Sequence, residues 1–386
     1  MYICTDTEVI ILSKEFRSRV YTNRPDYADL DSPEKFQAIQ DIIATRLRQH
    51  PKAICSYSGG ADSDILIDLI ERTRKMFGDG YLQPVKYVFF NTGLEMKATK
   101  DHVKATAEKY GVEIEEIKPK INIVTAVRKY GVPFMSKAFS ECLGELIKKE
   151  IPFDIVEEFK NSNDKCGKYK EFKERYPKST MALKFILDCD SKGNLAKNNQ
   201  LNISGNKYFL DFLRDNPPDF TISKKCCDYC KKEPAHRIEK GYEMKITGER
   251  EVEGGSRTTG KLLDADETKC FYHASDMYRF RPLYYVSDKD KAWYKEYYGI
   301  KYSDAYEVYG LTRTGCCGCP ISHKAVDDLE KIRPYEPNVV KAAWNIFGKS
   351  YEYRKKYNEY KAARMTEEKA KKQKNNQQLS LFDEKE

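Results

Sequence analysis

The chain has 386 residues, of which 40% are hydrophobic and 33% charged, a balance typical of a globular protein with a sizeable core. Its 68 basic and 60 acidic residues give a formal charge of +8, which permits an anionic partner without requiring one. No apolar run reaches the length of a membrane span and the start, MYICTDTEVI, lacks the layout of a signal peptide, so we expect a cytoplasmic protein without a membrane partner.

The hydrophobic pattern predicts alternating helices and strands in the first 120 residues. In chain order, the predicted elements are a helix over 33–49, a strand over 53–58 (AICSYS), a helix over 61–77, a strand over 85–90 (VKYVFF), a helix over 97–110 and a strand over 112–119 (VEIEEIKP). Short connections between them favour an α/β fold with a doubly wound parallel sheet.

The later part of the chain is less regular. We expect a return strand at 242–249 (YEMKITGE), and a helix over 354–374, where nine Lys or Arg stand against three Glu. The predicted plan is a helical lead-in (1–50), a main domain (51–325) with a mostly helical insertion (125–222) and a Cys-rich part (223–325), a basic helical extension (326–376) and a disordered tail (377–386).

The segment SYSGGADSD at 56–64 follows the first predicted strand directly and opens a predicted helix. Glycines let the backbone approach an anion, and the helix start adds free N–H donors and a favourable dipole. Serine hydroxyls add donors and an aspartate can hold Mg²⁺. The pattern therefore predicts a phosphate-binding loop of Ser56, Ser58, Gly59, Gly60, Asp62 and Ser63, although Walker spacing is absent. A plain Gly-Gly turn with Ser or Asp capping the helix is the alternative.

SGGADS resembles the S-G-G-x-D-S loop of the PP-loop ATP pyrophosphatases and PAPS reductases. FFNTGLE resembles the N-T-G-x-E segment of the PAPS reductase branch in particular, which implies near-site positions at Asn91, Thr92, Gly93 and Glu95. The resemblance implies a sheet of adenine nucleotide alpha-hydrolase type that binds ATP or PAPS with Mg²⁺.

A second stretch, ITGEREVEGGSR, resembles the G-x-R-x-x-E-S-x-x-R segment of the same family, although a Gly pair interrupts the Glu-Ser step. This implies anion-binding positions at Gly248, Arg250, Glu253 and, past the interruption, Arg257. Guanidinium groups suit planar recognition of sulfate or phosphate, and Arg313 is a further candidate. The alternative for each arginine is a plain surface residue. The expected catalytic residues are Ser58, Asp62, Arg250 and Arg313.

Six of the twelve cysteines form two groups, Cys226, Cys227 and Cys230, and Cys316, Cys317 and Cys319. Clustered thiols in a cytoplasmic chain suggest a metal. Either Cys226 and Cys227 join Cys316 and Cys319 around a [4Fe–4S] cluster, or Cys227 and Cys230 join them around Zn²⁺, and the spacing does not choose. A Cys-Cys pair with a following Lys and Pro and a distant Cys-x-x-Cys resembles the iron–sulfur adenylylsulfate reductases and the DNA phosphorothioation enzymes, which implies the first set.

The C-terminal part of the sequence departs from the pattern of the reductases. PAPS and adenylylsulfate reductases carry a nucleophilic cysteine in a C-terminal E-C-G-x-H motif, whereas no cysteine follows Cys319 in this sequence. The run Gln378, Leu379, Ser380, Leu381 and Phe382 instead resembles the Q-L-x-L-F peptide that binds the bacterial replication sliding clamp. The alternative is an apolar pair that folds back on the core.

Taken with the resemblance, these features lead us to expect an enzyme that adenylates an acceptor with ATP and replaces AMP by sulfur, in nucleic-acid modification. Its expected partners are DNA, the sliding clamp and a sulfur-donor protein. The alternatives are a PAPS or adenylylsulfate reductase, and a non-catalytic DNA-associated subunit that binds nucleotide without turnover.

Overall fold

The computed structural model describes residues 25–78, 80–194, 208–254, 268–274 and 276–383. The chain divides into two units of non-contiguous segments. Unit 1 comprises Met1–Asn91, Glu95–Lys118 and Glu233–Gly315, and unit 2 comprises Thr92–Leu94, Pro119–Lys232 and Cys316–Glu386. The expected main domain, 51–325, is thus shared between the two units.

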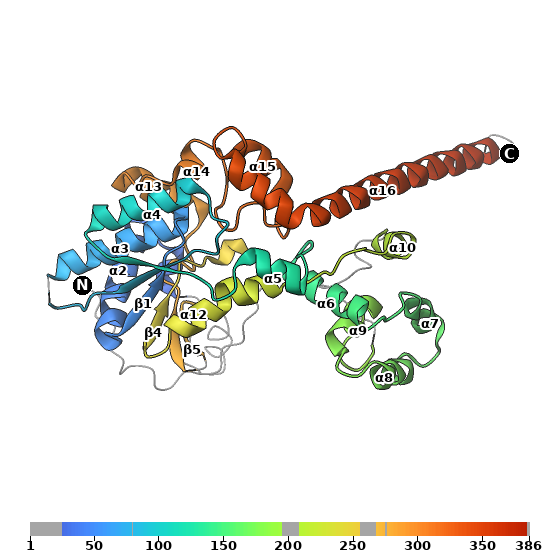
Figure 1. Cartoon of the computed structure of the whole chain (residues 1–386), viewed down its shortest axis with the longest axis horizontal. Helices are drawn as coiled ribbons and strands as arrows, with labels where there is room; N and C mark the ends of the chain where they lie inside the picture. The colour runs from blue at the N-terminus through green and yellow to red at the C-terminus, as the bar shows by residue number, and fades with distance from the viewer. Residues whose placement is uncertain (1–24, 79, 195–207, 255–267, 275, 384–386) are drawn as a thin grey trace. The chain divides into compact units, whose positions relative to one another are not determined.

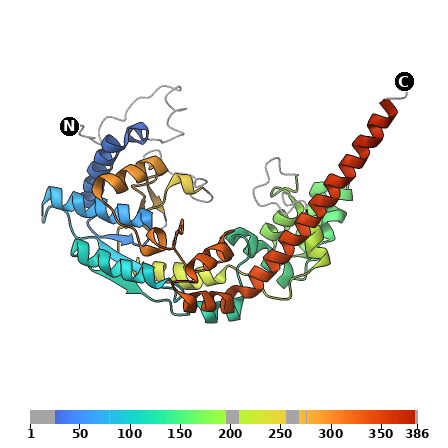
Figure 2. The ribbon, with the colours of Figure 1, turned by 90° about the horizontal axis from the view of Figure 1, so that it is seen from above.

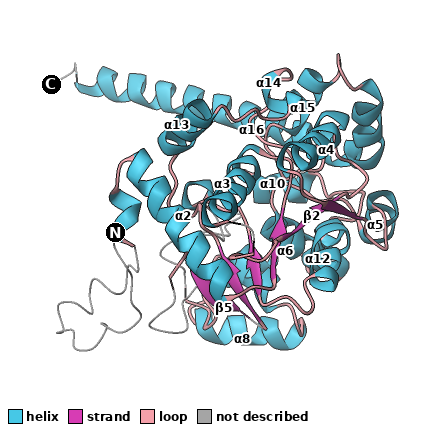
Figure 3. Ribbon diagram, turned by 90° about the vertical axis from the view of Figure 1, so that its left-hand side faces the viewer, coloured by secondary structure: helices cyan, strands magenta, loops and turns pink. Residues whose placement is uncertain are grey.

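Unit 1 is built on a six-stranded sheet with the order β3-β2-β1-β4-β6-β5. Neighbouring strands are parallel except β5 and β6, which are antiparallel. The strands are β1 (Ala53–Ser56), β2 (Lys86–Phe90), β3 (Ile114–Ile117), β4 (Met244–Ile246), β5 (Phe271–Ala274) and β6 (Met277–Phe280). The four strands predicted from the sequence are confirmed, and the β5–β6 hairpin is an addition that the sequence pattern did not predict. Figure 3 separates these strands from the helices by colour.

Helices cover both faces of this sheet, as a doubly wound fold requires. On one face α3 (Ala61–Phe77) packs against α2 (Ser32–Gln49), α4 (Lys97–Tyr110) and α13 (Asp288–Tyr298) (Figures 1 and 2). On the other face Ile54, Val88 and Ile117 pack with Ile238 of α12 (Glu233–Ile238). Successive residues of β1 and β2 therefore enter different cores, which explains why both strands read as continuous apolar runs. The short elements η1 (Asp26–Asp29), η3 (Glu251–Glu253) and α14 (Asp304–Glu307) complete unit 1.

A buried ion pair ties α2 to α13 in unit 1. Lys35 Nζ lies 2.7 Å from Asp290 Oδ2, and both side chains are almost fully buried. Burial alone would raise the pKa of Asp290, but hydrogen bonds from Lys35, Ser287 and Ser32 outweigh it and lower the pKa to about 2. This carboxylate is therefore charged at every pH at which the protein is expected to work.

Unit 2 contains helices around an aromatic core that includes Phe134, Phe172, Phe209 and Tyr357. Its helices are α5 (Ile123–Tyr130), α6 (Lys137–Lys148), α7 (Ile155–Asn161), α8 (Lys165–Arg175), α9 (Thr180–Leu187), α10 (Phe209–Asp215), α11 (Lys225–Cys227), the π-helical turn η2 (Asp228–Lys232), α15 (Ala325–Ile332) and α16 (Pro337–Asp383). The prediction that 125–222 is mostly helical is confirmed for the residues described.

Helix α16 extends further than the sequence analysis predicts. It continues through Asp383, so residues 377–383, expected in a disordered tail, are helical. The preceding run is rich in Lys, Glu, Gln and Ala and contains no Gly or Pro, so nothing in the sequence ends the helix. The side chains of Gln378, Leu379, Ser380, Leu381 and Phe382 lie outside what the structure describes. No helix in the described ranges is long and apolar enough to cross a membrane.

Candidate functional site

The predicted phosphate loop lies where the strand order of the unit 1 sheet reverses. Strand β1 has β2 on one side and β4 on the other, and open α/β sheets bind ligands beyond the carboxyl ends of strands at such a point. Ser56 ends β1, and four residues separate it from Ala61, the first residue of α3. Gly59 has φ +66°, and a Cβ there would lie 2.9 Å from Thr99 Cγ2, so the turn needs glycine for conformation and for space.

Hydrogen bonds within the loop are centred on the Ser63 hydroxyl. Ser63 Oγ accepts from the Gly60 N–H at 3.0 Å, donates to the Gly60 carbonyl at 2.7 Å and lies 3.1 Å from Ser58 Oγ. Ser63 therefore holds the turn in shape, which agrees with the capping alternative for this one residue. Ser58 is exposed and its hydroxyl remains available to a ligand.

Two cations converge on the Asp62 carboxylate at the start of α3. Arg250 Nε lies 2.8 Å and Lys291 Nζ 2.9 Å from Asp62 Oδ1. The Arg250 side chain is only 7% exposed, and its Nη1 donates to the Val286 carbonyl at 3.2 Å. Asp62 Oδ1 and Arg250 Nε are both buried without an aligned hydrogen bond. The two cationic side chains can therefore bind an anionic ligand, and the Asp62 carboxylate can bind a cation.

Two further predicted residues position Arg250 rather than a ligand. A Cβ on Gly248 would lie 3.2 Å from the Asp62 carbonyl oxygen, so the chain after β4 passes close to the start of α3. Glu253 Oε2 accepts a hydrogen bond from the Arg250 N–H at 3.1 Å. Arg257 lies outside the described residues.

The sequence analysis missed three residues beside the loop: Lys291, Tyr306 and Thr314. The Tyr306 hydroxyl accepts from the Ala61 N–H at 3.3 Å and from the Thr314 N–H at 3.1 Å. A Cβ on Gly60 would lie 2.9 Å from Thr314 Oγ1. Tyr306 and Ala61 are separated by 245 residues, so no local sequence signal could have joined them.

The segment after β2 places its predicted residues in different surroundings. The Asn91 N–H donates to the Ile117 carbonyl at 3.0 Å, its amide donates to Glu116 Oε1 at 3.1 Å, and Glu95 is buried, all in unit 1. Thr92 and Gly93 belong to unit 2, where Thr92 Oγ1 lies 3.4 Å from Cys316 Sγ. Arg313 is exposed, and no ion pair or hydrogen bond of its side chain occurs within the described ranges.

Four cysteine thiols of unit 2 lie near enough to interact electrostatically. Cys226 interacts electrostatically with Cys227, Cys316 and Cys319, and Cys319 with Cys316 and Cys227. Cys230, which is buried in the η2 turn, donates to the Ile121 carbonyl at 3.5 Å. The choice of Cys226 rather than Cys230 as a ligand beside Cys227, Cys316 and Cys319 stays a prediction.

The surroundings of these thiols shift their pKa values in different directions. The hydrogen bond with Cys226, helped by Lys137 and Lys231, lowers the pKa of Cys227 to about 6, while the same contact raises the pKa of Cys226. Burial and neighbouring Cys316 raise the pKa of Cys319 to about 12. The described cysteines form no disulfide.

The donor set was compared with the two metal groups that the sequence suggests. A structural zinc draws four ligands around one ion, with Zn–S near ~2.3 Å. In the described part of the chain, no group of three His, Cys, Asp or Glu side chains is arranged to hold a metal ion. A [4Fe–4S] cluster uses four thiolate donors, the number that Cys226, Cys227, Cys316 and Cys319 would supply.

Comparison with known proteins places this architecture. The family model described as Phosphoadenosine phosphosulfate reductase domain matches residues 52–150 and 171–322, more than half of the chain. No significant match was found among curated protein sequences.

Solved structures give weak likenesses. Phosphoadenylyl-sulfate reductase from Candida auris, in a phosphate complex, is 15% identical, with 80% of this chain and 97% of that chain covered and a TM-score of 0.37. The NH3-dependent NAD synthetase from Campylobacter jejuni is 11% identical, with 84% and 96% covered and a TM-score of 0.32. The U34-tRNA thiolase NcsA from Methanococcus maripaludis, with its [4Fe-4S] cluster, is 13% identical, with 83% and 78% covered and a TM-score of 0.30. TM-scores of this size support no argument on function, and the sheet order and family match define the fold.

Proposed function

The chain belongs to the phosphoadenosine phosphosulfate reductase domain family. We propose that it is an enzyme that catalyses a reaction of an adenine nucleotide bound at the loop Ser58–Ser63. The observation that carries this proposal is the buried Arg250, which meets Asp62 at 2.8 Å beside Lys291 at the start of α3. Loop N–H groups, a helix N-terminus and two cations at one place suit the phosphates of a nucleotide.

Within the family, we propose ATP as the nucleotide and adenylation as the first reaction. An acceptor oxygen attacks the α-phosphorus, the bond from that phosphorus to the bridging oxygen breaks, and pyrophosphate leaves. The acceptor proton passes to solvent. Arg250 and Lys291 would stabilise the charge that develops on the leaving phosphates, because they are preorganised and partly desolvated.

Mg²⁺ fits the residues present at this loop. Asp64 Oδ2 is a buried carboxylate oxygen without a hydrogen-bond partner among the described residues, and Asp62 Oδ1 is a buried carboxylate oxygen held by Arg250 and Lys291. Carboxylate oxygens are ligands that Mg²⁺ prefers. Bound with ATP, the ion would neutralise phosphate charge. Asp62 would then exchange one of its cationic partners for the metal.

We propose that sulfide-level sulfur then attacks the acceptor atom that carries the adenylated oxygen. The bond from that atom to the new sulfur forms, its bond to the oxygen breaks, and AMP leaves with the oxygen. The thiols Cys226, Cys227, Cys316 and Cys319 would hold a [4Fe–4S] cluster, which when bound supplies iron sites for sulfur handling. The acceptor in this proposal is nucleic acid, with a sulfur-donor protein as partner. The tail motif Gln378–Phe382 would bind the sliding clamp and bring the enzyme to DNA.

A second candidate is reduction of PAPS or adenylylsulfate, favoured by the family match and by the NTGLE segment at 91–95. The two reactions use different nucleotides and leave different products. Anaerobically purified protein should be incubated with ATP and Mg²⁺, and separately with PAPS and a reductant, each with and without duplex DNA. Chromatography would then identify the products.

Adenylation predicts AMP and pyrophosphate from ATP, increased by DNA. Adenosine 3′,5′-bisphosphate and sulfite from PAPS would instead establish the reductase. Nucleotide binding without product in any incubation would contradict both reactions and support the non-catalytic subunit.

A further inference from the structure

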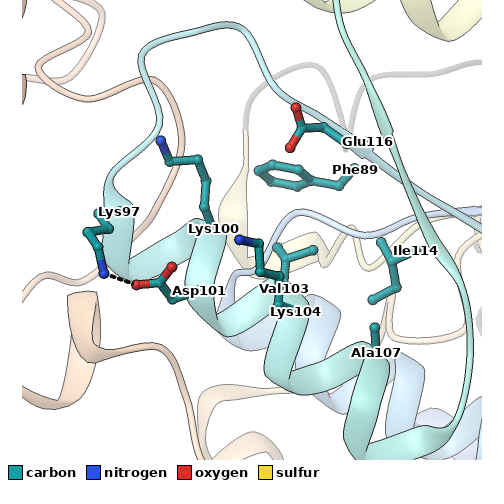
Figure 4. A pocket seen from close by; sticks show the side chains of 9 residues that line it. All are labelled: Phe89, Lys97, Lys100, Asp101, Val103, Lys104, Ala107, Ile114 and Glu116. Carbon is teal, nitrogen blue, oxygen red and sulfur yellow. Dashed lines mark hydrogen bonds and ion pairs between the residues drawn. The ribbon is translucent and has the colours of Figure 1, made fainter.

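A pocket of about 550 Å³ lies in unit 1 between helix α4 and strands β2 and β3 (Figure 4). Its volume falls in the range of small-molecule sites, roughly 300–1,000 Å³. No residue of the loop Ser58–Ser63 lines it, so it is a different place from the nucleotide site proposed above.

Positive charge exceeds negative charge along its wall. Lys97, Lys100 and Lys104 line the pocket from α4, against the carboxylates of Asp101 and Glu116. Asp101 is occupied by an ion pair with Lys97, which Figure 4 marks with a dashed line. Glu116 faces the pocket from the strand side. The side chains of Lys100 and Lys104 form no ion pair or hydrogen bond with the described residues, although both lysines help to lower the pKa of Asp101 electrostatically.

The two unpaired lysines lie close to each other on the helix. They are four residues apart, so their backbones are separated by about 6 Å along the helix axis. Like charges at this spacing repel and destabilise a helix. An anion held between the two ammonium groups would remove the repulsion and take both of them as hydrogen-bond donors.

The rest of the wall is apolar. Phe89, Val103, Ala107 and Ile114 line the pocket together with the lysines (Figure 4). A ligand that fits must therefore carry an apolar body as well as negative charge. Lysine ammonium groups act as point charges and are common phosphate ligands in proteins.

We infer that this pocket binds the phosphate group of an organic phosphate ester, with the ester's apolar part against Val103 and Ile114. The inference is independent of the proposed function. The pocket nevertheless adjoins the phosphate loop, because a Cβ on Gly59 would lie 3.2 Å from Val103 Cγ2. Glu116 also accepts a hydrogen bond from Asn91, in the segment predicted to lie near the nucleotide.

The test measures the affinity of the full chain for phenyl phosphate, a phosphate ester with an apolar ring, by titration calorimetry. Wild type should bind phenyl phosphate more tightly than inorganic phosphate. The double variant Lys100→Gln/Lys104→Gln should weaken binding about tenfold or more, the scale of losing one charge-assisted hydrogen bond. Lys109→Gln, an exposed lysine of the same helix outside the pocket, is the matched control and should bind as wild type.

Two results would overturn the inference. One is unchanged phenyl phosphate binding by the double variant with its fold verified by circular dichroism. The other is loss of binding in Arg250→Met, which would place the phosphate at the loop instead. If wild type binds phenyl phosphate but not ATP, the pocket stands and the proposed function fails.

A second titration identifies the source of the phosphate. Fluorescein-labelled duplex DNA should lose affinity for the double variant if the pocket takes a nucleic-acid phosphate. Unchanged DNA binding with lost phenyl phosphate binding would identify a free small phosphate ester as the ligand.

Discussion

Replacing Arg250 by methionine separates the stability of unit 1 from its ability to bind nucleotide. Methionine keeps most of the buried length of the side chain and removes the charge. The guanidinium meets Asp62 at 2.8 Å and Asp288 at 2.9 Å. The substitution therefore removes one partly buried pair and one pair on the surface.

The two pairs contribute differently to the free energy of unfolding. Asp288 is 84% exposed, so its pair is worth about 0–1 kcal/mol. Breaking a fully buried pair costs about 3–5 kcal/mol because a charge is left alone, but Asp62 keeps Lys291 at 2.9 Å. We expect Arg250→Met to lower the free energy of unfolding by about 1–2 kcal/mol.

Nucleotide binding should be affected more strongly. Loss of a charge-assisted hydrogen bond to phosphate costs about 1.5–3 kcal/mol, which corresponds to about a 10- to 150-fold weaker affinity. Calorimetric titration with a non-hydrolysable ATP analogue measures it. The control is Lys289→Met, which removes an exposed charge from the same helix as Lys291. The reasoning fails if Arg250→Met binds within twofold of wild type, or if Lys289→Met loses as much.

Three other predictions concern different parts of the chain. Gly59→Ala should lower the free energy of unfolding, measured in urea, by about 2 kcal/mol or more. Gly111→Ala, at a position with a similar φ of +64° and open space around it, should lower it only by the backbone cost of about 1 kcal/mol. Equal losses would contradict the close packing described for the loop. Cys227→Ser should abolish the iron and acid-labile sulfide of anaerobically purified protein, whereas Cys166→Ser should retain both; a variant of Cys227 with full iron content would remove it from the ligand set. The pKa of Asp290 in the folded protein lies below its unfolded value, so its stabilising effect should be complete above about pH 4 and lost toward about pH 2. The free energies of unfolding of Asp290→Asn and wild type, measured in urea, should therefore differ less as the pH falls through this window. A constant difference would contradict the shift.

The sequence predicted those parts of the fold that depend on local pattern. The loop Ser58–Ser63 was found because a buried run, two glycines and an amphipathic helix follow one another directly. The hairpin of β5 and β6 was missed because Phe271–Ala274 and Met277–Phe280 mix aromatic, basic and apolar residues without a clean alternation. The hydrogen bonds of β6 with β4 and β5 define this hairpin, and the local sequence pattern does not show them.

The site shows the same division. Arg250 was found through a motif, but Lys291 and Tyr306 reach the loop only through long-range packing. Cys230 lies in the π-helical turn that follows Cys227, and the sequence carries no signal for that turn.

The central claim is that the loop Ser58–Ser63 presents the α-phosphorus of ATP to an acceptor. The most direct measurement incubates anaerobic protein and duplex DNA with Mg²⁺ and ATP labelled at either the α- or the γ-phosphate. The account predicts γ-label in pyrophosphate and α-label in AMP or on the acceptor. Label from the γ-position in inorganic phosphate, with ADP as the other product, would contradict it.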